Sequence, residues 1–311
     1  MNGDLTLNPF QTSTPVVQDF GTYTITFKLA TSLHYDSRIY ITLPTNLQVD
    51  RTSSTAFSCS VQFGADVKQG NYCKLDTNLL VDMKPIFVSV AKNVVAGGTE
   101  VKVVIGSSTQ KISNPVSAKE CGDWKVSTFN IIGDKEWLVD TASATTTNLK
   151  FTATAGTITT GIVSIIKVAG AKNIASSESD TYKFDLTLPH SLPAFGKIVL
   201  KLPSSITIPS TAPVASSCFT YRPSSSSSRT QQFCSVQNGN TEVQITFQTG
   251  FTVNLTSREI SIELQGFRNP RTTQETGTFI ANSFDKDGTT PIDTMGIFNM
   301  KILMDDVPQV P

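Results

Sequence analysis

The sequence predicts an all-β protein that consists of two tandem, homologous antiparallel β-sandwich domains. Three observations predict this. The 311 residues include 42 Thr and 33 Ser, and the branched side chain of threonine favours strands over helices. Apolar and polar residues alternate over short segments, which is the pattern of half-buried strands. The second half of the chain also matches the first half, as expected for a duplicated domain.

The repeat covers the whole chain and sets the domain boundaries. Matching residues lie 159 positions apart without a gap up to the first cysteines, and small loop insertions shift the register beyond them. The matches include Tyr23/Tyr182, Leu43-Pro44/Leu202-Pro203, Cys59/Cys218, Glu100/Glu259, Asn114-Pro115/Asn269-Pro270 and Asp140-Thr141/Asp293-Thr294. The predicted domains are residues 1–156 and 157–311, and each has the size of an ordinary domain.

Each domain is predicted to contain about seven strands, separated by Gly, Pro, Asn and Ser. Alternate residues are apolar in most of them, as in Tyr23, Ile25 and Phe27. Proline ends the third strand because it has no N–H to donate, and Gly97-Gly98 is expected to form a hairpin turn before the fifth. The predicted strands lie near residues 5–7, 23–29, 39–43, 86–90, 101–105, 124–129 and 149–154 in the first domain, and near 163–168, 182–188, 198–202, 243–247, 260–264, 279–284 and 300–304 in the second.

This strand pattern resembles the immunoglobulin-like and fibronectin-type repeats of large surface proteins, including those of protists. The resemblance covers both copies and implies an Ig-like sandwich architecture only, since no functional residue can be transferred. Two features depart from true immunoglobulin domains. The Cys…Trp…Cys spacing is absent, and the two cysteines of each copy lie close in sequence instead of bridging the sheets.

The repeat predicts how four of the five cysteines pair. Cys59 and Cys73 occupy the positions of Cys218 and Cys234, which favours the disulfides Cys59–Cys73 and Cys218–Cys234. Closing a loop of ~15 residues is worth ~3 kcal/mol, and such bonds indicate an oxidising, extracellular or cell-surface location. The alternative is two reduced buried thiols per domain in a cytosolic protein. Cys121 has no counterpart, so we expect either a buried free thiol or a link between chains.

Two segments are candidates for glycosylation. Asn254-Leu255-Thr256 is an N-glycosylation sequon, which is meaningful if the protein is eukaryotic and secreted. The residues Ser224, Ser225, Ser226, Ser227 and Ser228 are a candidate O-glycosylation cluster, with a plain flexible linker as the alternative.

No catalytic, metal or cofactor site is predicted, and the chain is not expected to be an enzyme. His34 and His190 occupy different repeat positions and are expected to be surface residues. The segment Asp285–Gly288 starts like a calcium loop but lacks the later glutamate, so we expect a turn. The cysteine pairs have no nearby histidine and supply too few zinc ligands. Trp124 is expected to lie in the core.

Charge and hydropathy exclude two kinds of partner. Lys and Arg number 25 and Asp and Glu also number 25, so there is no basic excess to neutralise a nucleic-acid backbone. No apolar run reaches the ~18 residues of a membrane-spanning helix, and residues 1–6 lack the features of a signal peptide. We therefore expect a soluble chain, which is compatible with the mature part of an exported protein.

Two functions remain open. The first is a structural subunit that forms a head-to-tail fibre or surface assembly with copies of itself, through edge or terminal strands. Met1 and Pro311 both align with Thr160 of the repeat, which leads us to expect that the end of one molecule meets the start of the next. The second is an adhesin or receptor ectodomain fragment that binds a glycan or a protein through loops of one copy.

Overall fold

The computed structural model consists of strands and turns in all the residues that it describes. These are residues 3–7, 11–49, 59–65, 73–81, 84–91, 93–106, 112–122, 124–142, 151–166, 180–208, 218–223, 229–253, 258–296 and 300–302. No helix occurs among them. The prediction of an all-β, sandwich-type protein is therefore confirmed. Contacts divide the chain into two compact units, Met1–Thr154 (unit 1) and Ala155–Pro311 (unit 2).

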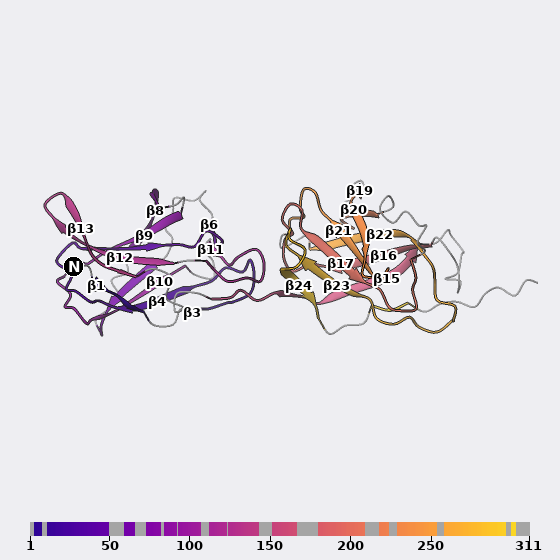
Figure 1. The fold of residues 1–311 in the computed structure, drawn as a ribbon, viewed down its shortest axis with the longest axis horizontal. Coiled ribbons are helices and arrows are strands. Elements are labelled where there is room, and N and C mark those ends of the chain that lie inside the picture. The colour runs from indigo at the N-terminus through magenta and orange to yellow at the C-terminus, as the bar shows by residue number, and fades with distance from the viewer. Residues whose placement is uncertain are drawn as a thin grey trace, which may run out of the picture. The chain divides into compact units, whose positions relative to one another are not determined.

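Unit 1 contains two main sheets and one small one (Figure 1). The six-stranded sheet has the order β1-β13-β12-β5-β9-β8. The five-stranded sheet has the order β2-β4-β10-β7, with β3 also paired to β4, and β6 pairs with β11. The strands are β1 (Gly3–Asp4), β2 (Thr6–Leu7), β3 (Gln11–Thr12), β4 (Tyr23–Lys28), β5 (Arg38–Thr42), β6 (Gln48–Val49), β7 (Cys59–Phe63), β8 (Cys73–Val81), β9 (Lys84–Val90), β10 (Glu100–Ile105), β11 (Ile112–Ser113), β12 (Lys125–Ile132) and β13 (Lys135–Ala142).

Unit 2 repeats the strand order of unit 1. Its six-stranded sheet has the order β14-β24-β23-β17-β21-β20, and its five-stranded sheet has the order β15-β16-β22-β18-β19. The strands are β14 (Gly156–Ile158), β15 (Thr160–Ile166), β16 (Asp180–Thr187), β17 (Lys197–Lys201), β18 (Cys218–Tyr221), β19 (Thr230–Gln231), β20 (Phe233–Gln237), β21 (Glu242–Thr246), β22 (Glu259–Phe267), β23 (Ile280–Phe284) and β24 (Pro291–Met295).

The predicted alternation places one face of each strand in the core. In β4, Tyr23, Ile25 and Phe27 are buried and the residues between them are partly exposed. Residues of both unit 1 sheets form one apolar cluster, which also contains Trp124, so Trp124 lies in the core as predicted. Its ring centroid is 5.7 Å from that of Tyr23. Burial of these alternate side chains between two sheets is the main favourable contribution to folding.

The first strand of each unit departs from the predicted antiparallel pattern. β1 pairs in parallel with β13, the last strand of its sheet, and β14 pairs in parallel with β24. The chain then crosses to the other sheet, where β2 and β15 pair antiparallel with β4 and β16. The opening segment of each unit therefore belongs to both sheets, which single-sequence periodicity cannot reveal because alternation does not specify the neighbour.

Several predicted elements differ from the structure. β13 and β24 were not predicted, because the first half of β13 is exposed and carries charged residues. Residues 151–154 form isolated bridges instead of a final strand, and Met300 likewise forms one bridge, to Phe279. Gly97 and Gly98 form a turn, but it is not a hairpin, since β9 and β10 lie in different sheets.

A buried tyrosine–asparagine hydrogen bond explains one landmark of the repeat. The Tyr23 hydroxyl donates to Asn114 Oδ1 at 2.9 Å, and the Tyr182 hydroxyl donates to Asn269 Oδ1 at 2.5 Å. In unit 1, Asn114 Nδ2 also donates to the carbonyls of Thr14 and Val16, at 2.7 and 2.5 Å. This side chain therefore ties the amino-terminal segment to the end of the core, where an unpaired amide would be costly.

The connection between the units is very short. Thr154 still belongs to the hydrogen-bonded structure of unit 1, because its N–H donates to Pro15 O at 2.8 Å and its carbonyl accepts from Val17 N–H at 2.9 Å. Gly156 already pairs with Asp293 in unit 2. Only Ala155 lies between these two backbone-paired residues.

Asn114→Ala is expected to destabilise unit 1 by about 2–3 kcal/mol, since it removes the acceptor of the buried Tyr23 hydroxyl bond and one donor to each of the Thr14 and Val16 carbonyls. Urea unfolding measures this change. The matched control is Asn93→Ala at an exposed position, for which we expect less than about 0.5 kcal/mol. Equal effects of the two substitutions would show that the buried amide is not a structural tie.

Candidate functional site

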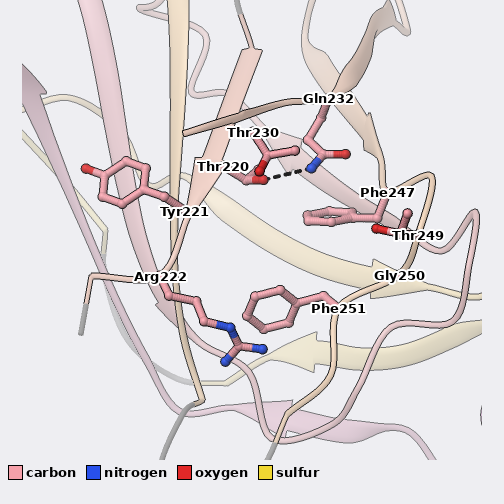
Figure 2. A pocket seen from close by; sticks show the side chains of 9 residues that line it. All are labelled: Thr220, Tyr221, Arg222, Thr230, Gln232, Phe247, Thr249, Gly250 and Phe251. Carbon is pink, nitrogen blue, oxygen red and sulfur yellow. Dashed lines mark hydrogen bonds between the residues drawn. The ribbon is translucent and has the colours of Figure 1, made fainter. Parts of the chain in front are cut away.

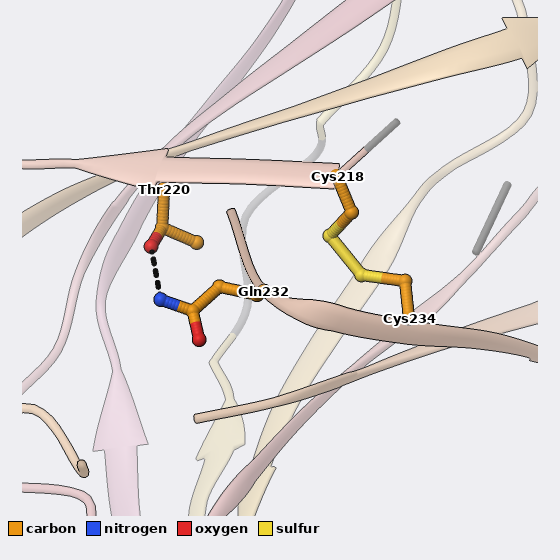
Figure 3. The surroundings of a disulfide bond; sticks show 4 residues. All are labelled: Cys218, Thr220, Gln232 and Cys234. Atoms are coloured by element: carbon orange, nitrogen blue, oxygen red, sulfur yellow. Dashed lines mark hydrogen bonds between the residues drawn. A yellow bond between two sulfur atoms is a disulfide. The ribbon is translucent and has the colours of Figure 1, made fainter. Parts of the chain in front are cut away.

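The Cys218–Cys234 disulfide links the two sheets of unit 2 (Figure 3). Cys218 begins β18 in the five-stranded sheet, while Cys234 lies in β20 of the six-stranded sheet. The expectation that the cysteines do not bridge the sheets is therefore wrong for this pair. The reason is local: β19 pairs with β18, and after Gln232 the chain passes directly into the other sheet as β20.

Of the three other cysteines, Cys59 and Cys73 correspond to the unit 2 pair, and Cys121 has no counterpart in the repeat. Cys59 is disulfide-bonded and lies in β7. Cys73 is the first residue of β8, and its side chain lies outside the described part, so its pairing with Cys59 stays a prediction. Cys121 is a free, fully buried thiol, and burial raises the pKa of this thiol to about 12. A bond from Cys121 to another chain would require unpacking of the core.

The candidate glycosylation residues lie outside the described residues. This applies to Asn254 and to Ser224, Ser225, Ser226, Ser227 and Ser228. Their modification stays a prediction.

His190 is not a surface residue, contrary to expectation. Its side chain is 10% exposed, and its Nδ1 lies 2.6 Å from Oδ1 of the fully buried Asp293. The other carboxylate oxygen of Asp293 accepts from the Ser283 hydroxyl at 3.0 Å. Gly156 packs directly against this group, since a Cβ there would overlap with Asp293 and His190.

Unit 1 holds its equivalent aspartate in another way. Asp140 Oδ2 accepts from the backbone N–H groups of Ala30 and Thr31 at 3.2 and 3.1 Å. Pro189 occupies the repeat position of Ala30 and has no N–H, and the His190 side chain takes over as the partner. The histidine–aspartate contact is thus explained by packing, since a buried carboxylate needs hydrogen-bond partners.

The segment Asp285–Gly288 forms a turn, as expected. Asp287 accepts hydrogen bonds from the backbone of Thr289 and Thr290, both at 2.8 Å, and from the Thr290 hydroxyl. These bonds, chiefly those from Thr290, lower the pKa of Asp287 to about 2. The Asp287 carboxylate therefore stabilises this turn. Within the described ranges, no group of three or more His, Cys, Asp and Glu could hold a metal ion.

A candidate binding site in the described part of the chain is a cavity in unit 2 (Figure 2), which the sequence did not predict. Its volume is about 210 Å³. It lies at the end of the core, where β18, β19 and the segment after β21 meet. The lining residues are Thr220, Tyr221, Arg222, Thr230, Gln232, Phe247, Thr249, Gly250 and Phe251.

Two phenylalanines and one arginine give this unit 2 cavity its chemical character. The rings of Phe247 and Phe251 lie 6.3 Å apart, at an angle of 62°. The Arg222 guanidinium lies 4.2 Å from the centre of the Phe251 ring and donates to Thr252 O. Stacking and hydrogen bonding together fix the cation beside the aromatic rings.

The disulfide positions the polar side of the cavity. Gln232 N–H donates to Cys218 O at 2.9 Å, and Gln232 Nε2 donates to Thr220 Oγ1, also at 2.9 Å. Both residues lie two positions from a disulfide cysteine (Figure 3). The covalent link between the sheets therefore limits the movement of this wall.

The described lining of the cavity offers aromatic, hydroxyl, amide and guanidinium groups that can contact a ligand. Its lining contains no histidine, carboxylate or thiol, which are the side chains most used as general bases and nucleophiles. The corresponding space in unit 1 is apolar: Val61, Phe63 and Val95 occupy the positions of Thr220, Arg222 and Phe251 and are buried in the core. A residue-by-residue comparison of the two copies shows this difference, and it could have indicated the unit 2 cavity from the sequence.

Comparison with known proteins gives weak structural similarity only. No family model matches the chain, and no curated protein sequence matches it. Similar solved structures include the C-terminal domain of the Streptococcus pyogenes antigen I/II-family protein AspA, at 11% identity over 98% of this chain and 99% of that one, with a TM-score of 0.31. Another is the collagen adhesin CNA from S. aureus, at 6% identity, 96% and 94% coverage and a TM-score of 0.25. Because these values are low, function has to be argued from the residues themselves.

His190→Ala is expected to destabilise unit 2 by about 2–4 kcal/mol, because it removes a partner from the buried Asp293 carboxylate. The measurement is urea unfolding, with hydrogen exchange of unit 2 amides to locate the effect. His34→Ala is the matched control, since the His34 side chain is exposed. Its substitution should change the free energy of unfolding by less than about 0.5 kcal/mol. A His190 variant as stable as the His34 variant would refute the structural role.

Proposed function

We propose that the chain is a non-enzymatic extracellular structural protein, a subunit of a fibre or surface assembly in which β-sandwich units follow one another head to tail. The observation that carries this proposal is the junction at Ala155. Thr154 pairs within unit 1 and Gly156 within unit 2. A single residue cannot act as a flexible spacer of the kind that separates independent domains.

The strand order of the two units supports a serial arrangement. Each unit opens with a short strand that pairs in parallel with the last strand of its own sheet. Each then crosses to the second sheet, so the same opening is built twice from different residues. A module that begins in this way can follow another without an intervening segment.

The location and the lack of catalysis are supported by chemistry. The Cys218–Cys234 disulfide favours an oxidising compartment, since cytosolic thiols are kept reduced. Among its described lining residues, the unit 2 cavity has no histidine, carboxylate or thiol to act as a general base or nucleophile. In the described part of the chain, no helix has the length and hydropathy needed to cross a bilayer.

Electron microscopy of the purified protein tests this proposal. We expect filaments whose axial repeat corresponds to one or two sandwich units. Insertion of a Gly-Ser-Gly-Ser segment after Ala155 is expected to make the filaments shorter and less regular, because it adds free rotation at the junction. The same insertion in the exposed turn at Gly133 is the control and should leave filaments unchanged. Monomers at high protein concentration would contradict the proposal.

The second candidate function is an adhesin or receptor module that binds a glycan. The unit 2 cavity favours it, because aromatic rings, an arginine and an amide surround a small space there, while three of the corresponding unit 1 positions hold buried apolar residues. A volume of about 210 Å³ is below the ~300 Å³ at which pockets for drug-sized ligands begin. It therefore suits one sugar residue.

Ligand titration by NMR tests this second function, with methyl α-D-glucopyranoside and D-glucuronate as probes. We expect saturable shifts at Gly250 with a Kd of about 1 mM, the range of a small ligand on an open site, and tighter binding of the carboxylate. Arg222→Gln should weaken glucuronate binding about tenfold. Arg258→Gln, at an exposed position of the same unit, is the control. Unsaturable shifts with both probes would exclude this sugar site.

A further inference from the structure

Strand β15 lies at the edge of a sheet in the described part of unit 2. It is the outer strand of the five-stranded sheet and pairs on one side with β16, over seven residue pairs. Among the described residues, no strand pairs with its other side. Its sequence, Thr160-Gly-Ile-Val-Ser-Ile-Ile166, contains no charged residue and no proline. Edge strands usually carry such residues, or are very short, because their free backbone groups bind other strands.

Both faces of β15 carry apolar side chains. Val163 and Ile165 point into the core and are 6% and 8% exposed. Ile162 and Ile166 alternate with them and are 66% and 39% exposed. The outward face of a solvent-exposed antiparallel sheet is normally polar. Two outward isoleucines on the same uncharged edge therefore indicate a surface that is covered in the working protein.

The corresponding edge of unit 1 is interrupted. There the edge consists of β2 and β3, each of two residues, which pair with opposite ends of β4. The sequence between them includes Pro9, and proline cannot donate to a ladder. The long free edge is therefore a property of unit 2.

The sequence of β15 is symmetric about Ser164. Ile162 and Ile166 lie two positions on either side of it on the outer face, and Val163 and Ile165 flank it on the inner face. Two such strands can pair antiparallel with the Ser164 residues opposite each other. Ile162 of one copy then faces Ile166 of the other, and Val163 faces Ile165. Each pair joins two β-branched apolar side chains, which is a favourable cross-strand combination.

We propose that β15 is a self-association site, at which two copies of this chain pair antiparallel about Ser164 and join their five-stranded sheets. The contact is isologous, so the same strand serves both partners and one pairing closes the interface. It links chains side by side and does not depend on the head-to-tail order proposed above.

Charge permits this pairing. On the neighbouring strand β16, Lys183 lies beside Ser164 and Asp185 beside Ile162. Their side chains form an ion pair at 2.9 Å within one chain. In the pair of copies the two Lys183 residues are three strand spacings apart, about 14 Å. This exceeds the Debye length of about 8 Å at physiological salt, so their repulsion is screened.

The size of the contact predicts a weak interaction. A seven-residue edge is about 23 Å long, and one strand pair buries less than the ~1,200 Å² of a standard stable interface. We therefore expect a dissociation constant between about 1 μM and 1 mM. Such a contact is occupied where chains are concentrated, as in a surface assembly.

Sedimentation equilibrium of the full chain tests the interface. At protein concentrations too low for filaments to form, we expect a monomer–dimer equilibrium that Ile162→Lys weakens at least tenfold, because lysine on an edge strand opposes pairing. Ile132→Lys is the matched control, since Ile132 is 64% exposed on β12 of unit 1 and should leave the equilibrium unchanged. A chain that stays monomeric at about 1 mM, or a dimer that Ile162→Lys does not weaken, overturns the proposal.

Cysteine cross-linking tests the register independently of stability. In the proposed pair the two Ser164 Cα atoms lie about 4.5–5.5 Å apart, which is within the range of a disulfide. Ser164→Cys is therefore expected to give a covalent dimer on mild oxidation. Ile166→Cys alone should not, but should cross-link to Ile162→Cys when the two variants are mixed. Absence of the Ser164→Cys dimer overturns the register.

Filament formation by electron microscopy is a separate readout, so this interface and the head-to-tail function can fail independently.

Discussion

Each unit closes around one buried carboxylate. Asp140 and Asp293 lie on the last strand of their six-stranded sheets, and each faces a glycine of the first strand, Gly3 or Gly156, in a parallel pair. The carboxylate also holds the loop after β4 or β16, through backbone N–H groups in unit 1 and through His190 in unit 2. A buried carboxylate is costly without hydrogen-bond partners, so these bonds hold the loop against the last strand, while the parallel pairing holds the start of the unit against the same strand. The one-residue junction depends on this, because Gly156 is held immediately after Ala155.

The sequence predicted what depends on local pattern and missed what depends on neighbours. Alternation located β4, β5, β10 and their equivalents, since a half-buried strand shows its inward face in the sequence. The sequence of a strand does not show which other strand it pairs with. The parallel first strands, the disulfide that crosses between sheets and the buried position of His190 all result from contacts between distant segments. The unit 2 cavity was missed for a related reason. Phe247 and Phe251 have the spacing of ordinary core residues, and most of the polar residues that line the cavity with them come from another segment, between Thr220 and Gln232.

The two units share a framework and differ in their surfaces. The buried Tyr–Asn and Asp groups are repeated, so they belong to the fold. The cavity and the free β15 edge occur on unit 2, while unit 1 has core side chains and short edge strands at the corresponding places. Duplication allows this division, because one copy can keep the stable form while the other acquires binding surfaces. The unrepeated features of unit 2 are therefore the ones to which ligand binding and side-by-side association are assigned.

Weak contacts suffice for assembly when a chain offers more than one. A net charge of zero gives little long-range repulsion between copies, so short-range contacts decide whether chains associate. Once two chains are held by one contact, a second becomes intramolecular and benefits from an effective concentration in the millimolar range. A β15 pairing with a dissociation constant in the micromolar to millimolar range would then be largely occupied within a head-to-tail array, yet sparse among free chains. Lateral pairing would thus follow assembly along the chain direction, and premature association of free chains would be limited by the small size of the edge.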